Sequence, residues 1–292
     1  MKVVETIEAM RRERERLRGS VGFVPTMGFL HEGHLSLMRR ARELADHLVV
    51  SIFVNPTQFG PDEDLEDYPR DVEGDRKKCE ELGCEVLFMP DAETMYHDDH
   101  ATTVRVPELE EVLCGPQRPG HFAGVCTVVS KLFHIVEPDV AVFGQKDYQQ
   151  LAIIRRMTRD LNMPVDIVGG ATVREEDGLA ISSRNKYLDD QQRRDARCLS
   201  RALRRAWKTY REGERDGAAL VEVARQRLLE TVDAEAIDYV ECVHPETLAR
   251  YEGANAAIDG ADGAVLATAV QIGRARLIDN LRLDKPLPET LK

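Results

Sequence analysis

The first part of the chain alternates short apolar runs with segments of helical periodicity. Apolar runs typical of β-strands occur at 20–26, 48–54, 84–90, 140–144 and 165–169. Helical periodicity fills much of the space between them, at 33–46, 71–82, 125–136 and 148–161. Gly83 follows the second helix, where a C-terminal cap is expected, and Pro164 ends the fourth. Short β-branched strands separated by helices predict an α/β fold with a mainly parallel, doubly wound sheet.

The pattern changes after about residue 173. A polar segment, Arg174–Asn185, leads into two long charged helices, which we expect at 189–212 and 217–231. Strand-like runs follow at 237–243, 263–270 and 274–281. Helices followed by sequential strands predict a smaller α+β domain with an antiparallel sheet. We therefore expect two domains, residues 1–173 and 174–292.

Composition narrows the class of protein. The 292 residues carry a net charge of −12, which argues against a nucleic-acid binder but not against an anionic substrate bound by local basic groups. No apolar run approaches the roughly 20 residues that cross a membrane, and we expect no membrane association. The N-terminus enters a charged helix without a signal-peptide pattern, and the six cysteines lack a C-x-x-C pair. Reduced thiols in a cytoplasmic protein are the simplest interpretation. The acidic segment 61–67 is expected to be a solvated loop.

The segment 25–34, with the sequence PTMGFLHEGH, carries the clearest chemical signal. A strand ends there in a glycine-bearing loop, which opens a helix with His31 and His34 three residues apart. A helix N-terminus offers unpaired N–H groups and a partial positive charge, which suit phosphate. Core histidines or a zinc site are the alternatives, although His97, His100 and His121 form no recognisable metal pattern with this pair. The H-x-G-H pattern is typical of adenylyl-transferring α/β proteins.

Polar residues also follow other predicted strands, where ligands bind in doubly wound sheets. Gln58 offers a donor and an acceptor to a small polar substrate, or it only fixes its own loop. Gly144 allows close approach of a ligand to the backbone, and Lys146 supplies a flexible charge for phosphate. Asp147 could orient that lysine or hold a hydrated Mg²⁺.

A further polar segment, Gly178–Asn185, lies near the expected domain boundary. Ser182 and Ser183 beside Arg184 could neutralise a triphosphate, and ordering of this segment could close the site over a bound nucleotide. A static polar linker is the alternative. The chain shows no nucleophile–base triad, so this set of cations and amides favours phosphoryl or adenylyl transfer.

These segments occur together in the order PTMG-x-LHEGH, VNPTQF, RPGHF-x-GV, KDYQQL and SSRN. With them the chain closely resembles the pantothenate synthetase (pantoate–β-alanine ligase) family over nearly all of its length. The resemblance implies a Rossmann-like N-terminal domain, a smaller C-terminal lid domain and a homodimer. It also implies an enzyme of pantothenate biosynthesis in the coenzyme A pathway, with ATP, pantoate and β-alanine as substrates and Mg²⁺ accompanying ATP. Pantoate would first form pantoyl-adenylate and pyrophosphate, and β-alanine would then displace AMP.

The resemblance also implies roles for individual residues. His34 would donate a proton or stabilise phosphate, with His31, Lys146 and Arg184 as further catalytic groups. The residues implied to bind ATP are Met27, Gly28, Phe29, Leu30, His31, Glu32, Gly33, His34, Gly144, Gln145, Lys146, Asp147, Val173, Ile181, Ser182, Ser183 and Arg184. Gln58 would contact pantoate beside β-alanine, Gln150 would hold pantoate, and Asp75 is the suggested Mg²⁺ ligand. The family often has Glu where Gln145 stands and Met where Ile181 stands. Another H-x-G-H adenylyltransferase and a non-catalytic nucleotide sensor are the alternative functions.

Overall fold

The structure, a computed structural model, describes residues 1–61, 65–66 and 68–291. Most of the acidic segment expected as a loop, at 62–64 and 67, lies outside the described residues. Contacts between Cα atoms divide the chain into two compact units. The sheet unit comprises Met1–Glu111, Gly115–Gln145 and Ile153–Ala171. The C-terminal unit comprises Val112–Cys114, Lys146–Ala152 and Thr172–Lys292, so it includes two short segments from earlier in the chain.

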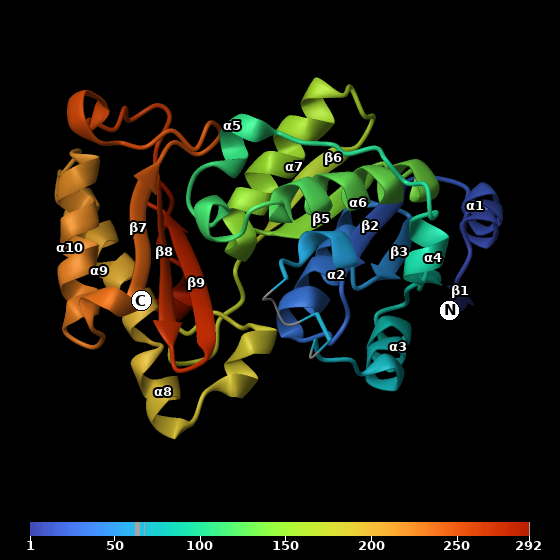
Figure 1. The fold of residues 1–292 in the computed structure, drawn as a ribbon, viewed down its shortest axis with the longest axis horizontal. Helices are drawn as coiled ribbons and strands as arrows, with labels where there is room; N and C mark the ends of the chain where they lie inside the picture. The colour runs from blue at the N-terminus through green and yellow to red at the C-terminus, as the bar shows by residue number, and fades with distance from the viewer. Residues whose placement is uncertain (62–64, 67, 292) are drawn as a thin grey trace. The chain divides into compact units, whose positions relative to one another are not determined.

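The sheet unit is built on six parallel strands in the order β1-β4-β3-β2-β5-β6 (Figure 1). Their bounds are β1 (Lys2–Val4), β2 (Val21–Thr26), β3 (His47–Ile52), β4 (Val86–Phe88), β5 (Val140–Gly144) and β6 (Asp166–Gly170). The predicted parallel α/β sheet is confirmed. Strands β3 and β5 lie on opposite sides of β2, so the strand order reverses there. A ligand site is expected at the carboxyl ends of the strands at such a reversal.

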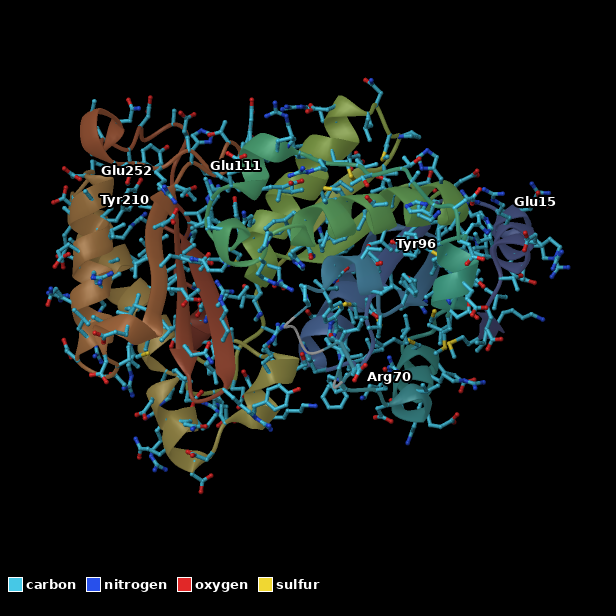
Figure 2. All side chains as sticks on the ribbon, viewed as in Figure 1. Glu15, Arg70, Tyr96, Glu111, Tyr210 and Glu252 are labelled. Carbon is cyan, nitrogen blue, oxygen red and sulfur yellow. The ribbon has the colours of Figure 1, made fainter. Side chains whose placement is uncertain are left out.

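Amphipathic helices cover the sheet because their apolar residues recur at helical spacing. The helices of this part of the chain are α1 (Ile7–Arg16), α2 (Glu32–Leu44), α3 (Val72–Glu81), α4 (Ala92–Met95), α5 (Pro107–Glu110), α6 (His121–Val136) and α7 (Tyr148–Asp160). Helix α2 packs on β2, β3 and β5 through buried residues that include Met38 and Ala41. Charged side chains such as Glu15 on α1 are exposed (Figure 2).

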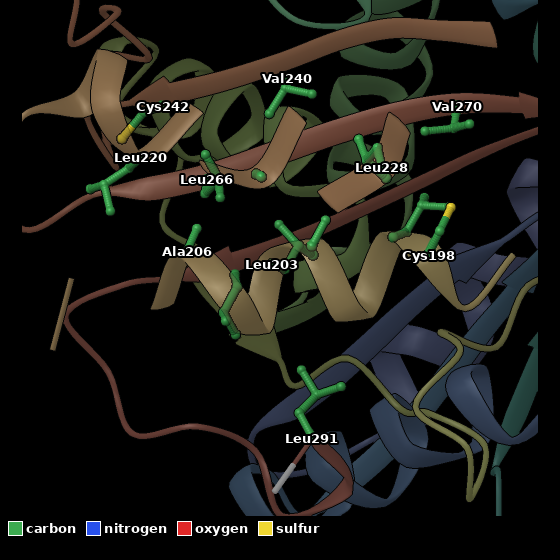
Figure 3. Close-up of a cluster of buried hydrophobic side chains, with 14 of the residues drawn as sticks. Cys198, Leu203, Ala206, Leu220, Leu228, Val240, Cys242, Leu266, Val270 and Leu291 are labelled. Atoms are coloured by element: carbon green, nitrogen blue, oxygen red, sulfur yellow. The ribbon is translucent and has the colours of Figure 1, made fainter. Parts of the chain in front are cut away.

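The C-terminal unit has an antiparallel sheet of β7 (Ile237–Val243), β8 (Val265–Ile272) and β9 (Ala275–Arg282). Its helices are α8 (Asp190–Asp195), α9 (Cys198–Arg211) and α10 (Gly217–Leu229). Leu203 on α9, Leu228 on α10 and Leu266 on β8 contribute to one buried core (Figure 3). The predicted smaller α+β part is therefore confirmed.

The single helix expected at 189–212 is wrong, because the structure has two helices there. Helix α8 ends at Asp195 and α9 begins at Cys198. Ala196 and Cys198 are both fully buried. Residues two apart point to different sides of a continuous helix, so a change of direction allows both to enter the core. No glycine or proline marks this break in the sequence.

All six cysteines are buried and unpaired, as the expectation of reduced thiols requires. Burial raises the pKa of Cys126, Cys198 and Cys242 to about 12. A thiol with such a pKa is a poor nucleophile near neutral pH. Among the described residues, no helix is both long and apolar enough to span a bilayer.

Candidate active site

The loop between β2 and α2 adopts a left-handed backbone at two consecutive residues. Gly28 has φ +85° and Phe29 has φ +52°. A glycine tolerates this conformation, and a Cβ at position 28 would also lie 3.1 Å from Asp75 Oδ2. Phe29 has no such freedom, and left-handed backbone costs an L-residue about 1–2 kcal/mol. Something outside the loop must therefore hold Phe29 in place.

Asp75 on α3 holds this loop through two backbone hydrogen bonds. The N–H of Phe29 donates to Oδ2 at 2.7 Å, and the N–H of Leu30 donates to Oδ1 at 2.7 Å. The carboxylate is only 2% exposed, and Lys78 Nζ lies 3.9 Å from Oδ1. Burial raises the pKa of Asp75, while the two backbone donors and Lys78 act to lower it. The carboxylate therefore fixes the backbone immediately before the histidine pair.

His31 and His34 lie together at the start of α2. His31 precedes the first residue of the helix, and the two ring centroids are 4.1 Å apart. The backbone N–H of His31 donates to Nδ1 of His34 at 3.3 Å. Because Nδ1 accepts, the neutral His34 ring carries its proton on Nε2. The helix N-terminus adds a partial positive charge at the same place.

Gln58 lies in a network of buried polar groups after β3. Its Oε1 accepts from Asn55 Nδ2 at 3.1 Å, and its Nε2 donates to Met27 Sδ at 3.1 Å. Asn55 is 1% exposed, and its Oδ1 accepts from the hydroxyl of Tyr96 at 2.8 Å (Figure 2 labels Tyr96). Gln58 therefore joins the loop after β2 to the loop after β3. Both roles considered for it, fixing the loop and contacting substrate, are compatible with this position.

His121 and Gly124, at the start of α6, contact the backbone of Gln58. The Nδ1–H of His121 donates to the carbonyl oxygen of Gln58 at 2.8 Å, and Arg118 donates to Nε2 at 2.9 Å. A Cβ at Gly124 would lie 2.7 Å from Gln58 Cα, so this close approach requires glycine. The RPGHF-x-GV run thus has a supporting function that the sequence analysis did not assign. Its arginine, histidine and glycine spacing was the available signal.

In the C-terminal unit, the segment after β5 carries another group of predicted residues. Gly144, the last residue of β5, and Gln145 belong to the sheet unit, and Lys146 begins the segment Lys146–Ala152 of the C-terminal unit. Lys146 Nζ lies 3.9 Å from Asp147 Oδ1, and Asp147 stays a predicted partner either of that lysine or of hydrated Mg²⁺. Gln150, half-buried on α7, is predicted to hold pantoate together with Gln58.

The neighbouring residue Gln149 has a structural role that the sequence did not reveal. Its Oε1 accepts from the N–H of Cys114 at 2.9 Å, and its Nε2 donates to the carbonyl of Val112 at 2.6 Å. Gln149 is 5% exposed and ties the segment Val112–Cys114 to the C-terminal unit. Two adjacent glutamines are indistinguishable by sequence, and only burial separates them.

The last group of predicted residues lies on a hairpin in the C-terminal unit. The N–H of Ile181 donates to the carbonyl of Val173 at 3.0 Å. Ser182 then caps a 3₁₀ helix, Ser183–Tyr187, and its hydroxyl accepts from the N–H of Arg184 at 3.3 Å. Val173 and Ile181 are therefore hydrogen-bonded neighbours across the hairpin although they are eight positions apart in the chain, and Ser182–Arg184 follow Ile181 directly.

The described residues do not form a protein cage for a divalent cation. No group of three or more histidine, cysteine or acidic side chains with suitable geometry occurs among them. Both oxygens of Asp75 already accept backbone hydrogen bonds. Mg²⁺ usually keeps several waters and binds through one or two carboxylates and substrate phosphates, so the absence of a cage does not conflict with Mg²⁺ arriving with ATP.

The fold and this site define a class of protein: an α/β protein with a donor-rich helix N-terminus at the reversal of a parallel sheet, as in nucleotide-binding enzymes. Comparison with known proteins is more specific. The family model described as pantoate-beta-alanine ligase matches residues 2–282. The pantothenate synthetase of Heliobacterium modesticaldum is 54% identical over 287 residues, covering 96% of this chain and 99% of that protein. That of Thermotoga petrophila is 51% identical over 283 residues, covering 96% and 99%.

Solved structures agree with this result. A pantothenate synthetase from Thermus thermophilus superposes with a TM-score of 0.89 at 45% identity, covering 97% of this chain and 99% of that one. A pantoate-beta-alanine ligase from Francisella tularensis, solved with a β,γ ATP compound and β-alanine, superposes with a TM-score of 0.77 at 31% identity, covering 98% and 99%. The chain belongs to the pantoate–β-alanine ligase family.

Replacement of Asp75 tests whether its carboxylate holds the loop. In Asp75→Asn, one carboxylate oxygen becomes an NH₂ group, so one of the two backbone N–H groups loses its acceptor. A buried donor without a partner costs about 1–3 kcal/mol. We expect the free energy of unfolding to fall by that amount in urea denaturation, and ATP-dependent activity to fall with it.

Asp71→Asn is the matched control for this change. Asp71 is an exposed residue that accepts from the N–H of Gly74 at the start of the same helix, and asparagine caps helices equally well. Equal stability and equal activity of the two variants would show that the Asp75 carboxylate is not needed to hold the loop.

Proposed function

We propose that the protein condenses pantoate with β-alanine to form pantothenate, in two steps that consume ATP. The pantoate carboxylate attacks the α-phosphorus of ATP, which forms pantoyl-adenylate and releases pyrophosphate. The amine of β-alanine then attacks the activated carbonyl and displaces AMP. The observation that carries this proposal is the match to the pantoate-beta-alanine ligase model over residues 2–282, with every quoted motif in order.

In the first step the protein must stabilise negative charge that develops on phosphate oxygens. His34 Nε2–H is the proposed donor, because Nδ1 already accepts from the backbone of His31. Lys146 and Arg184 are proposed to supply positive charge, and the N–H groups at the start of α2 a partial charge. Prepositioned donors of this kind stabilise the transition state without reorganisation during the reaction.

The other residues predicted to bind ATP are close in the sequence to His34, Lys146 or Arg184. Met27–His31 precede α2, and Glu32 and Gly33 are its first two residues. Gly144 is the last residue of β5, and Gln145 follows it. Val173 and Ile181 pair in the hairpin, and Ser182 and Ser183 follow at the start of the 3₁₀ helix. We propose that all of them contact the nucleotide.

Pantoate is proposed to bind the amides of Gln58 and Gln150. The position of Gln58 supports this role, because the residue is 8% exposed and its side-chain amide is held by Asn55 and Met27 before substrate arrives. In the second step β-alanine is proposed to lie beside Gln58. The adenylate must be protected from water, and we propose that Gly178–Asn185 orders over the bound nucleotide for this purpose.

We propose that Mg²⁺ binds with the ATP phosphates. Asp75 remains its proposed protein ligand, through lone pairs that the two backbone donors leave. We also propose that the protein is a cytoplasmic homodimer with residues 174–292 acting as a lid, as the family resemblance implies.

The direct test is product analysis with purified protein, ATP, pantoate and β-alanine. We expect pantothenate and AMP in equal amounts, with no ADP. A sensor would release no AMP, and another adenylyltransferase would release pyrophosphate without forming an amide.

His34→Ala should mainly lower the rate of the first step. Loss of one donor at a site of developing charge typically costs about 10²–10³ in rate. We expect pyrophosphate exchange into ATP to fall by that factor, whereas His134→Ala, which alters an exposed histidine on α6, should leave it unchanged. Near-normal exchange in His34→Ala would refute the role of His34.

Gln58→Ala and Gln150→Ala should weaken pantoate more than ATP. A neutral amide suits a hydroxylated carboxylate better than a polyphosphate, and an unpaired buried polar group costs about 1–3 kcal/mol. Titration of each ligand, with Gln226→Ala on the exposed face of α10 as control, measures the two affinities. A defect confined to ATP would mean that the assignment of the two subsites is reversed.

A further inference from the structure

The two faces of strand β9 have different surroundings within the C-terminal unit. Successive side chains of a strand point to opposite faces. Leu277 and Leu281 belong to the buried core, and Asp279 lies between them on the same face. Asn280, the next residue, lies on the other face. A carboxylate among core leucines needs an explanation, because burial of an unpaired charge is costly.

Asp279 forms a buried ion pair with Arg174. The guanidinium donates to both carboxylate oxygens, from Nη1 to Oδ2 at 2.6 Å and from Nη2 to Oδ1 at 2.8 Å. The two side chains are 1% and 2% exposed. Arg174 Nη1 also donates to the carbonyl of Gly178 at 3.1 Å. Asp279 thus fixes, through Arg174, both the beginning and the turn of the hairpin that follows residue 173.

This hairpin carries residues predicted to bind ATP. Val173 precedes Arg174 directly, and Ile181 follows Ala180, which pairs with Arg174 across the hairpin. The N–H of Glu175 donates to the carbonyl of Leu179 at 2.9 Å and closes the ladder. Ser182–Arg184 follow Ile181 directly in the chain. Because Arg174 pairs with Ala180, fixing Arg174 also fixes where the backbone of Ser182–Arg184 begins.

Asn280 holds the other predicted segment of the same unit. Its Nδ2 donates to the carbonyl oxygen of Lys146 at 2.8 Å, and the residue is 8% exposed. Its own N–H donates to Asp279 Oδ1 at 2.8 Å. Two adjacent residues of one strand thus bond, on opposite faces, to the Lys146 segment and to the hairpin.

A buried ion pair often contributes little net stability, because desolvation offsets the attraction. The contacts of Asp279 and Asn280 instead fix the positions of two backbone segments. We propose that Asp279 and Asn280 are positioning residues for ATP, which hold Lys146 and the Val173–Arg184 segment in one fixed arrangement through β9. The proposal rests on the proposed function, since it assumes that both segments contact the nucleotide.

Asn280→Ala tests the Lys146 side of this arrangement. It removes the hydrogen bond to the Lys146 carbonyl, and the loss of such a bond corresponds to about a three- to tenfold effect. We expect kcat/KM for ATP in pyrophosphate exchange to fall by that factor. Hydrogen exchange should accelerate in peptides covering 145–150 and stay unchanged in those covering 173–181.

Thr268→Val is the matched control. Thr268 lies opposite Asp279 on β8, is 1% exposed, and donates to the carbonyl of Tyr239 at 3.2 Å. It therefore also loses one buried bond to a backbone carbonyl in the same sheet, but not one to a predicted ATP segment. Its kcat/KM and its exchange at 145–150 should equal those of the wild type.

Asp279→Asn tests the hairpin side, where exchange should accelerate at 173–181. If this variant does not fold, Asn280→Ala decides the question. The proposal is overturned if Asn280→Ala matches Thr268→Val in both kcat/KM and hydrogen exchange. A wild-type protein without pantoate-dependent exchange would instead refute the proposed function, and the hydrogen-exchange comparison would still test the positioning.

Discussion

The candidate site of the sheet unit depends on one buried carboxylate. The loop after β2 must turn sharply into α2, and it does so with Gly28 and Phe29 both in the left-handed region. Asp75, more than forty residues further along the chain, accepts the N–H groups of Phe29 and Leu30 and so stabilises a backbone that the loop sequence alone would disfavour. The start of α2, with its partial charge and its histidine pair, is placed by this contact.

The C-terminal unit also has a buried carboxylate that fixes backbone geometry. Asp279 is buried as Asp75 is, and it too acts on backbone geometry, through Arg174 and the carbonyl of Gly178. Removing charges from water costs several kcal/mol per ion, so such groups are poor sources of stability. Their benefit is that the loops we propose to bind phosphate are already ordered without ligand, which lowers the entropy cost of binding and of reaching the transition state.

The sequence predicted the elements well where their periodicity was regular. The parallel strands, the helices between them and the antiparallel sheet all occur close to the expected positions. The break between α8 and α9 could not be predicted, because it depends on burying both Ala196 and Cys198 rather than on a helix-breaking residue. The three-residue strand β1 was also missed, since so short a run has no periodicity.

For the site, motifs in the sequence predict which residues bind substrate but not the contacts that hold those residues. The quoted runs led to the correct family, because local spacing is visible in a sequence. The supporting contacts join distant positions: 46 residues separate Phe29 from Asp75, and 134 separate Lys146 from Asn280. A single sequence carries no signal of such pairs. The role of Asp75 in holding the backbone of Phe29 and Leu30 could therefore not be predicted from the sequence.

The buried carboxylate of Asp75 orders the proposed phosphate-binding loop before any ligand binds. Amide hydrogen exchange of the ligand-free protein, resolved residue by residue by NMR, tests it most directly. The N–H groups of Phe29 and Leu30 should exchange as slowly as that of Val24 in the central strand, and they should lose this protection in Asp75→Asn. Exchange of both amides at the rate of a solvated loop in the wild-type protein would contradict the account.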